Sequence, residues 1–163
     1  MKGLPTPLVN GMATVCRVGK IKPAPGTWGS AVGTLFYALL LQNAPQAVVF
    51  AAVIVLLIAG VFFCDEAERR MNARDPGCIV LDEFVAMQIV YLGLATPESL
   101  HWRIIQLFAG FLLFRFFDIA KPLGISRLQD LPGGLGVMAD DILAAVFSCA
   151  ILHVLTRLVV MFA

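Results

Sequence analysis

Long apolar segments alternate with shorter polar connections along this chain. Residues 47–64 are a run of 18 residues without a charge. As a helix this run would be about 27 Å long, close to the thickness of the hydrocarbon core of a bilayer. It therefore predicts a transmembrane helix. Four further apolar segments predict additional spans, of which the first fits either a full crossing or a half-helix: 28–41, 79–95, 104–117 and 142–162.

This pattern predicts an all-α, multi-span helical membrane protein with about four to five apolar helices. The composition agrees, because 60% of the residues are hydrophobic, 14% are charged and the mean hydropathy is +0.88. A chain of 163 residues fits a single domain over 1–163. The net charge of +1 argues neither for nor against a polyanionic partner, but the lack of interleaved basic and aromatic residues argues against nucleic-acid binding. The four cysteines are scattered, which argues against a zinc site or a disulfide framework.

The basic residues predict how the chain is oriented in the membrane. When alternate connections are counted, one side holds only Arg103 and Arg157, and the other side holds most of the positive charge. By the positive-inside rule the more basic side is cytoplasmic. Its basic residues are Lys2, Arg17, Lys20, Lys22, Arg69, Arg70, Arg74, Arg115, Lys121 and Arg127.

Five carboxylates are predicted to meet at this cytoplasmic interface. The third apolar segment begins with Asp82 and Glu83. The fourth is followed by Asp118, and the fifth is preceded by Asp140 and Asp141. Ionised carboxylates in apolar surroundings are costly unless they are paired or bind a cation. A cluster of oxygen ligands therefore predicts a hard divalent cation such as Mg²⁺, Mn²⁺ or Ca²⁺.

Basic and hydroxyl side chains near these acids suggest an anionic ligand. Arg115 lies three residues before Asp118 and Lys121 lies three after it, so a continuing helix would place all three on one face. Lys22, Thr27 and Ser30 flank a Pro-Gly turn that leads into a helix, and a helix N-terminus favours an anion. Together with the carboxylates, these residues predict a phosphate held by Mg²⁺.

Several of these residues also have simpler interpretations. Asp140 could only cap a helix, and Asp75, which precedes Pro-Gly, could only be a turn residue. The roles of Asp75 and Asp130 stay open at this point. Three basic residues could act only as determinants of membrane orientation: Arg115, Lys121 and Arg127. These interpretations do not explain why acids from three separate connections lie at the same predicted membrane surface.

The chain resembles the phosphatidylglycerophosphatase A family over nearly its whole length. Four stretches in the same order carry the resemblance: KPAPGTWGS at 22–30, DP at 75–76 with IVLDE at 79–83, FRFFDIAKP at 114–122, and GLGVMADD at 134–141. The resemblance implies Mg²⁺-dependent hydrolysis of phosphatidylglycerophosphate to phosphatidylglycerol and inorganic phosphate in bacterial phospholipid synthesis. It also implies a place in the bacterial inner membrane, with the active site facing the cytoplasm.

Under this interpretation the acidic residues have different roles in catalysis. One or two Mg²⁺ ions would be held by Asp82, Glu83, Asp118, Asp140 and Asp141. Asp82, Glu83 and Asp141 would be catalytic, with Glu83 or Asp141 free to act as general base. The substrate phosphate would be bound by Lys22, Thr27, Ser30, Arg115 and Lys121. Water is favoured as the nucleophile over an aspartate, because no single aspartate stands out.

Two other classes of function are compatible with the same residues. A small cation or proton transporter would also place acids in a membrane, although transporter sites usually lie near the bilayer midplane. A structural subunit of a lipid-synthesis complex would make the acidic residues dispensable in the isolated protein. The oligomeric state is left open by the sequence.

Overall fold

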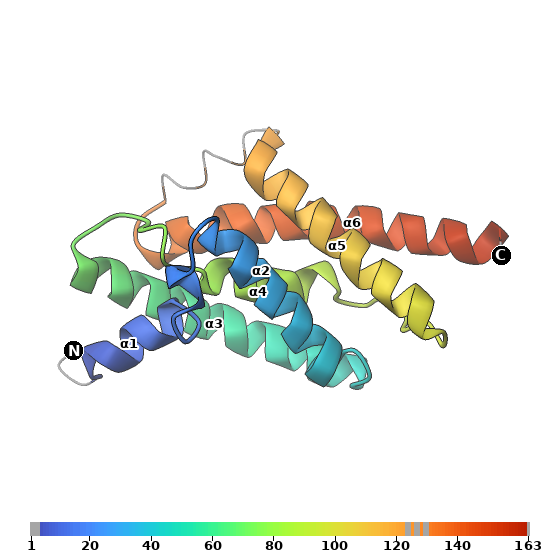
Figure 1. Cartoon of the computed structure of the whole chain (residues 1–163), viewed down its shortest axis with the longest axis horizontal. Coiled ribbons are helices and arrows are strands. Elements are labelled where there is room, and N and C mark those ends of the chain that lie inside the picture. The colour runs from blue at the N-terminus through green and yellow to red at the C-terminus, as the bar shows by residue number, and fades with distance from the viewer. Residues whose placement is uncertain (1–3, 123–124, 126–127, 129–130, 163) are drawn as a thin grey trace.

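The computed structural model of the protein describes residues 4–122, 125, 128 and 131–162, so that Lys2, Arg127 and Asp130 lie outside the described residues. Within the described residues all regular structure is helical, as predicted. The elements are α1 (Thr6–Ala13), the 3₁₀ turn η1 (Val18–Lys20), α2 (Pro25–Phe36), the π-helical turn η2 (Tyr37–Leu41), α3 (Gln46–Met71), α4 (Leu81–Val90), α5 (Leu100–Ala120) and α6 (Gly134–Phe162) (Figure 1).

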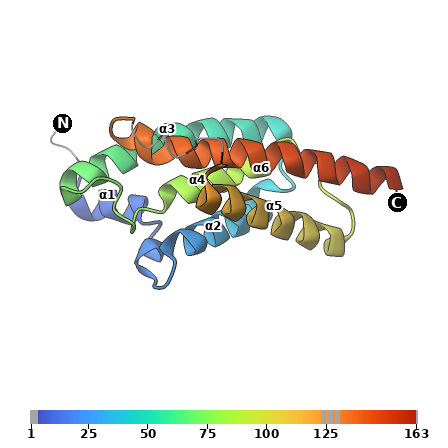
Figure 2. The same ribbon diagram turned by 90° about the horizontal axis from the view of Figure 1, so that it is seen from above.

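The short helix α4 lies at the centre of the molecule. It contacts α2, α3, α5 and α6, and in Figure 2 it runs between the pair α3 and α6 on one side and the pair α2 and α5 on the other. Nine of its ten residues are buried. A helix that is apolar all round is either a membrane span or a buried core helix. The position of α4 shows that it is a core helix of this bundle.

The prediction of a span over 79–95 is therefore wrong. At helical rise the ten residues of α4 extend about 15 Å, half the thickness of the hydrocarbon core. The chain leaves the helix after Val90 and passes through a turn in which Gly93 has φ +76°. The segment is apolar because other helices surround it, and a pattern of apolar residues does not distinguish helical neighbours from lipid.

Among the described residues, two helices are long and apolar enough to cross a membrane, α3 and the part Gly134–Val159 of α6. This is fewer than the four to five helices predicted. α3 contains the predicted span 47–64 but continues through the charged residues after it to Met71. α6 starts at Gly134, eight residues before the predicted segment 142–162. α5 has 21 residues but includes Arg103, Arg115 and Asp118.

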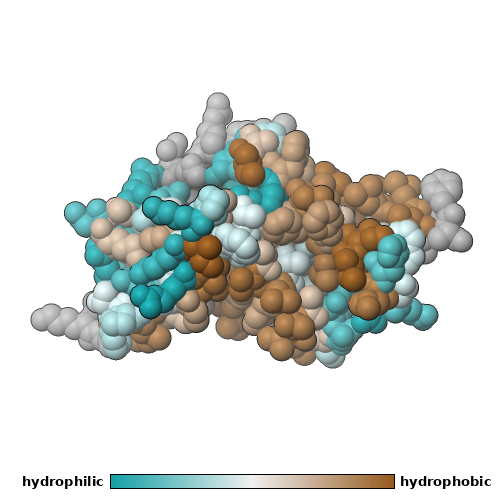
Figure 3. Space-filling view, viewed as in Figure 1, coloured by the Kyte–Doolittle hydropathy of each residue, from teal (hydrophilic) through white to brown (hydrophobic). Residues whose placement is uncertain are grey.

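The outer surface of the bundle is largely apolar. Only 22% of the most apolar window of α3, and of α6, is buried inside the molecule. Large exposed hydrophobic side chains follow one another along α3 and α5, among them Phe50, Val55, Ile58, Ile104 and Phe108. In Figure 3 hydrophobic side chains cover the middle of the molecule, and hydrophilic ones gather toward the end where α3 terminates. This distribution fits a membrane-associated protein.

Close contact between α2 and α4 depends on a glycine. A Cβ atom at Gly33 would lie 2.8 Å from the carbonyl oxygen of Phe84 and 3.0 Å from the Cβ of Met87. The buried amide of Gln88 joins the two helices there, because its Nε2 donates to the carbonyl oxygens of Gly33 at 3.0 Å and Phe84 at 2.8 Å. The C-terminal half of α2 is thereby held against α4.

We expect Gly33→Ala to destabilise the protein by about 1–3 kcal/mol, because the added methyl group overpacks the contact with α4. The matched control is Gly11→Ala in α1, where a Cβ would meet no atom within 4 Å. That change should stabilise the helix by about 0.5–1 kcal/mol. Thermal unfolding of the purified protein in detergent measures both. Equal midpoints for the two variants would show that α2 and α4 are not packed as described.

Candidate active site

Three of the predicted acidic residues meet in a buried cluster. Asp82 and Glu83 come from the first turn of α4, and Asp141 comes from α6. One oxygen from each lies within 4.8 Å of the other two. Asp82 is 7% exposed and Asp141 is 4% exposed. Three carboxylates this close and this buried need positive charge or protons among them.

The local structure explains why Asp82 and Glu83 occupy this place. Both lie at the N-terminal end of α4, where free backbone amides and the helix dipole favour negative charge. The backbone N–H of Glu83 donates to Oδ1 of Asp82 at 3.0 Å. The preceding residue Val80 is fixed by a backbone hydrogen bond to Ala13 at 3.0 Å. The acidic pair is therefore positioned by both its own helix and the N-terminal segment.

Asp140 and Asp141 lie inside α6 rather than at its start. Because α6 begins at Gly134, Asp140 is in the second turn and does not cap the helix. The interpretation of Asp140 as a simple N-cap is therefore wrong. The two neighbouring acids diverge in their contacts, since Asp141 joins the cluster and Asp140 pairs with Lys121.

The environment of Glu83 gives the strongest indication that the cluster binds a ligand. Its Oε2 atom is buried and has no hydrogen-bond partner among the described residues. The N-terminal turn of α2 lies directly against it, because a Cβ at Gly26 would overlap Oε1 of Glu83. A buried carboxylate oxygen without a donor is costly. This orphaned atom, together with the all-oxygen ligand set, fits a hard cation such as Mg²⁺.

The predicted basic residues lie beside the cluster and pair with the remaining acids. Nη1 of Arg115 lies 2.7 Å from Oδ2 of Asp118, on one face of α5 as predicted. The same Nη1 donates to Oγ of Ser30 at 3.3 Å, and this hydroxyl donates to the carbonyl of Gly26 at 2.8 Å. Arg115 thus links the end of α5 to the N-terminal turn of α2.

Lys121 connects the end of α5 to α6. Its ammonium group bonds to the carboxylate of Asp140 and lies 4.0 Å from Oδ1 of Asp118. Burial opposes the charge of Lys121, but the hydrogen bond and charge of Asp140 outweigh it and raise the pKa of Lys121 above its ordinary value. The lysine therefore stays cationic next to the acidic cluster. Of the five predicted metal ligands, Asp118 and Asp140 have these cations as partners.

Two predicted phosphate-binding residues lie at the margin of this arrangement. Lys22 is exposed, and Thr27 is half-buried in the first turn of α2. Among the described residues neither side chain makes a hydrogen bond or an ion pair. Of the predicted phosphate-binding side chains, Arg115, Lys121 and Ser30 are therefore the ones tied to the acids or to each other.

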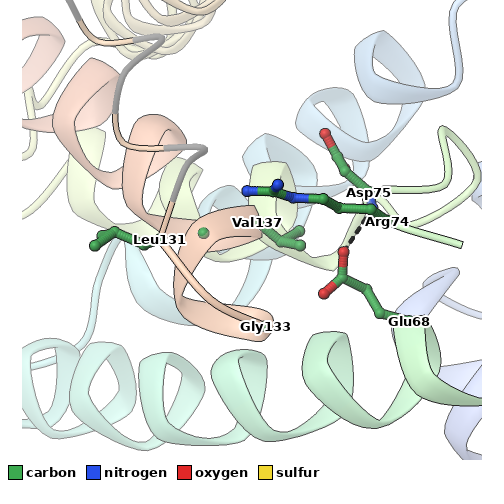
Figure 4. A pocket seen from close by; sticks show the side chains of 7 residues that line it. Glu68, Arg74, Asp75, Leu131, Gly133 and Val137 are labelled. Atoms are coloured by element: carbon green, nitrogen blue, oxygen red, sulfur yellow. Dashed lines mark hydrogen bonds between the residues drawn. The ribbon is translucent and has the colours of Figure 1, made fainter.

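A polar cavity of about 340 Å³ opens at the end of α3 (Figure 4). Glu68, Arg74 and Asp75 line it opposite Gly133 and Val137 at the start of α6. Oε1 of Glu68 accepts a hydrogen bond from the backbone N–H of Asp75 at 2.5 Å. Sequence reasoning missed Glu68 and treated Arg74 only as an orientation signal. The one available signal was the mixed-charge sequence that precedes Asp75.

Asp75 is more than a turn residue. Partial desolvation of its carboxyl group and, next, the charge of Asp140 raise the pKa of Asp75. Asp75 is nevertheless an exposed residue. The cavity also includes Gly136 and Val137, which lie about one turn before Asp140 and Asp141 on α6.

Comparison with known proteins identifies relatives of this chain. No solved structure matches the chain. A phosphatidylglycerophosphatase A of Haemophilus influenzae is 40% identical over 131 residues, which are 80% of this chain and 77% of that protein. One of Escherichia coli is 35% identical over 130 residues, 79% of this chain and 72% of that protein. A protein of Bacteroides thetaiotaomicron named as a candidate phosphatidylinositol-3-phosphatase is 34% identical over 135 residues, 80% of this chain and 82% of that protein.

The family comparison covers all four stretches that carry the resemblance. The model of the family described as Phosphatidylglycerophosphatase A matches residues 11–156, which include the acidic cluster, Arg115 and Lys121. The chain therefore belongs to the phosphatidylglycerophosphatase A family.

Proposed function

We propose that this protein is a lipid phosphatase that hydrolyses phosphatidylglycerophosphate to phosphatidylglycerol and inorganic phosphate, with Mg²⁺ bound at the acidic cluster. Family membership supports the reaction. The observation that carries the site assignment is the orphaned Oε2 of Glu83 beside Asp82 and Asp141, next to two cationic side chains. Acids for a metal and cations for a phosphate lie together only here among the described residues.

Asp82, Glu83 and Asp141 would hold the metal, and Asp118 and Asp140 would support it from the adjoining ion pairs. Mg²⁺, when bound, supplies charge neutralisation of the phosphate and lowers the pKa of the attacking water. The protein supplies a rigid arrangement of these carboxylates, because two of them are on the buried helix α4 and the third is on α6. Rigid placement of the acids limits the reorganisation needed during the reaction.

We assign proton acceptance from the attacking water to a carboxylate of the cluster that would use one oxygen for the metal and the other for the water. Glu83 is one candidate for this role. Asp141 is the other candidate for this role in the cluster. The glycerol oxygen of the headgroup leaves on the side opposite to the attacking water, as in-line transfer requires.

Arg115 and Lys121 would bind the phosphate oxygens and stabilise the charge that develops on them. Both already lie among carboxylates that hold them in place, Asp118 for Arg115 and Asp140 for Lys121. The Ser30 hydroxyl fixes the position of Arg115 by accepting its hydrogen bond. Thr27 and Lys22 would contribute only after substrate binds.

The apolar outer surface supports a multi-pass arrangement in the bacterial inner membrane. α3 and α6 would cross it, and α5 would lie in it with its charged residues near the two surfaces. The excess of basic residues around the acidic cluster supports a site facing the cytoplasm. The substrate headgroup would then reach the cluster from the membrane surface without leaving the bilayer.

We expect Asp82→Asn and Asp141→Asn each to lower kcat by about 100-fold or more, because each removes one negative ligand from the cluster. Glu98→Gln is the matched control, since Glu98 is an exposed carboxylate in the segment before α5. It should leave turnover unchanged. Phosphate release from phosphatidylglycerophosphate in detergent measures all three. Wild-type turnover in either aspartate variant would refute the site assignment.

A chelator should abolish phosphate release, and added Mg²⁺ should restore it, because the cluster needs a divalent cation to balance its charge. Glu83→Gln should raise the Mg²⁺ concentration required for half-maximal activity, as it removes one charge from the ligand set. Activity that survives complete chelation would contradict the metal-dependent mechanism. Cation or proton flux in proteoliposomes without hydrolysis would instead indicate a transporter.

Arg115→Lys should lower kcat/KM by about tenfold or more, since lysine cannot reach both Ser30 and Asp118 while contacting a phosphate. The control is the same change at Arg103, which lies on the same helix and whose Nε donates to the carbonyl of Pro97 at 2.6 Å. Arg103→Lys should leave kcat/KM within about twofold of the unmodified protein. Equal losses in both variants would mean that Arg115 acts only through stability.

A further inference from the structure

A cationic cavity lies at the end of the molecule remote from the acidic cluster. Its volume is about 390 Å³. One wall is the turn after α4, with Gly93, Leu94 and Ala95, and the other is the last part of α6, with His153, Thr156 and Arg157. The proposed phosphatase reaction uses none of these residues.

The charge of this cavity favours an anion. Arg157 is exposed and makes no hydrogen bond or ion pair with any described residue. Nε2 of His153 lies 3.0 Å from the carbonyl oxygen of Leu92, which fixes the ring against the turn. No acidic residue is among the described residues that line the cavity. A guanidinium with no partner among the described residues, beside a fixed imidazole, is suited to bind a phosphate group.

An apolar groove continues from this cavity along the outside of the bundle. It lies between α5 and α6, has a volume of about 310 Å³ and is lined by Trp102, Ile105, Leu155 and Val159. Thr156 lines both the groove and the cationic cavity. An anion site that adjoins an apolar groove matches an amphipathic molecule with one anionic group and one hydrocarbon chain.

The spacing between Asp141 and Arg157 along α6 is close to the thickness of the hydrocarbon core of a bilayer. Asp141 and Arg157 are separated by 16 residues, which at helical rise is about 24 Å. The intervening sequence has no charged residue. An arginine at this depth would reach the interface by extending its side chain. The cationic cavity would therefore lie at the level of phospholipid headgroups when the acidic cluster lies at the opposite surface.

We propose that this cavity and groove form a binding site for an anionic phospholipid, with its phosphate on Arg157 and an acyl chain against Trp102. The site is separate from the catalytic one and does not depend on the phosphatase assignment. A zwitterionic lipid fits less well, because no carboxylate lines the cavity to receive a choline. A free phosphate would use Arg157 but would leave the groove empty.

Trp102 provides the test because it lines the groove. The chain has two tryptophans, so Trp28→Phe leaves Trp102 as the only reporter. The full-length protein in detergent micelles is titrated with phosphatidylglycerol that carries brominated acyl chains, which quench tryptophan emission on contact. Brominated phosphatidylcholine with the same chains and inorganic phosphate are titrated in parallel.

We expect brominated phosphatidylglycerol to quench Trp102 at about fivefold lower concentration than brominated phosphatidylcholine, as the loss of one charge interaction would give. Arg157→Gln should abolish this difference, and Arg157→Lys should keep most of it. Circular dichroism of both variants verifies that they fold, and phosphate release from phosphatidylglycerophosphate should be unchanged.

Three results would overturn the proposal. Equal quenching by the two lipids would mean that Trp102 contacts only the unspecific lipid layer that surrounds any membrane helix. Displacement of brominated phosphatidylglycerol by low millimolar inorganic phosphate would identify a free-phosphate site instead. Preference for phosphatidylglycerol that persists in Arg157→Gln would likewise remove Arg157 from the site.

Discussion

The meeting of two carboxylates from the N-terminal end of the buried helix α4 with a third from α6 is the constraint on which the rest of this structure depends. Asp82, Glu83 and Asp141 are drawn together inside an otherwise apolar bundle, which costs free energy unless the charge is balanced. The helix dipole of α4 and the hydrogen bond from the Glu83 amide to Asp82 offset part of that cost. The remainder requires positive charge or protons among the three carboxylates, and this requirement is the basis of the proposed Mg²⁺ site.

The surroundings of the cluster follow from this constraint. α4 is buried because α2, α3, α5 and α6 pack around it, and this packing also buries Asp82 and Asp141. Two ion pairs, Arg115 with Asp118 and Lys121 with Asp140, place positive charge next to the cluster without neutralising it. The site thus has an acidic part that suits a cation and a basic part that suits an anion. The proposed complex of a metal ion with a phosphate ester would supply the cation and the anion together.

Part of this arrangement could be predicted from the sequence. The helical class, the helices around 47–64 and 142–162, and the meeting of acids from separate connections all follow from apolar periodicity and the position of charge. The extent of α4 could not be predicted, because Val85 and Met87 are as apolar against neighbouring helices as they would be against lipid. The pairing of Lys121 with Asp140 rather than Asp141 depends on the rotation of α6 about its axis, which no local sequence pattern specifies.

The length of α6 has a mechanical consequence. This helix of 29 residues carries Asp141 near one end and Arg157 near the other. A continuous helix cannot shorten or stretch appreciably, so the spacing between these side chains is fixed by backbone geometry. In a membrane thicker or thinner than this spacing, the protein can respond only by tilting or by deforming the lipids around it. The same rigid helix therefore makes the depth of the acidic cluster sensitive to bilayer thickness.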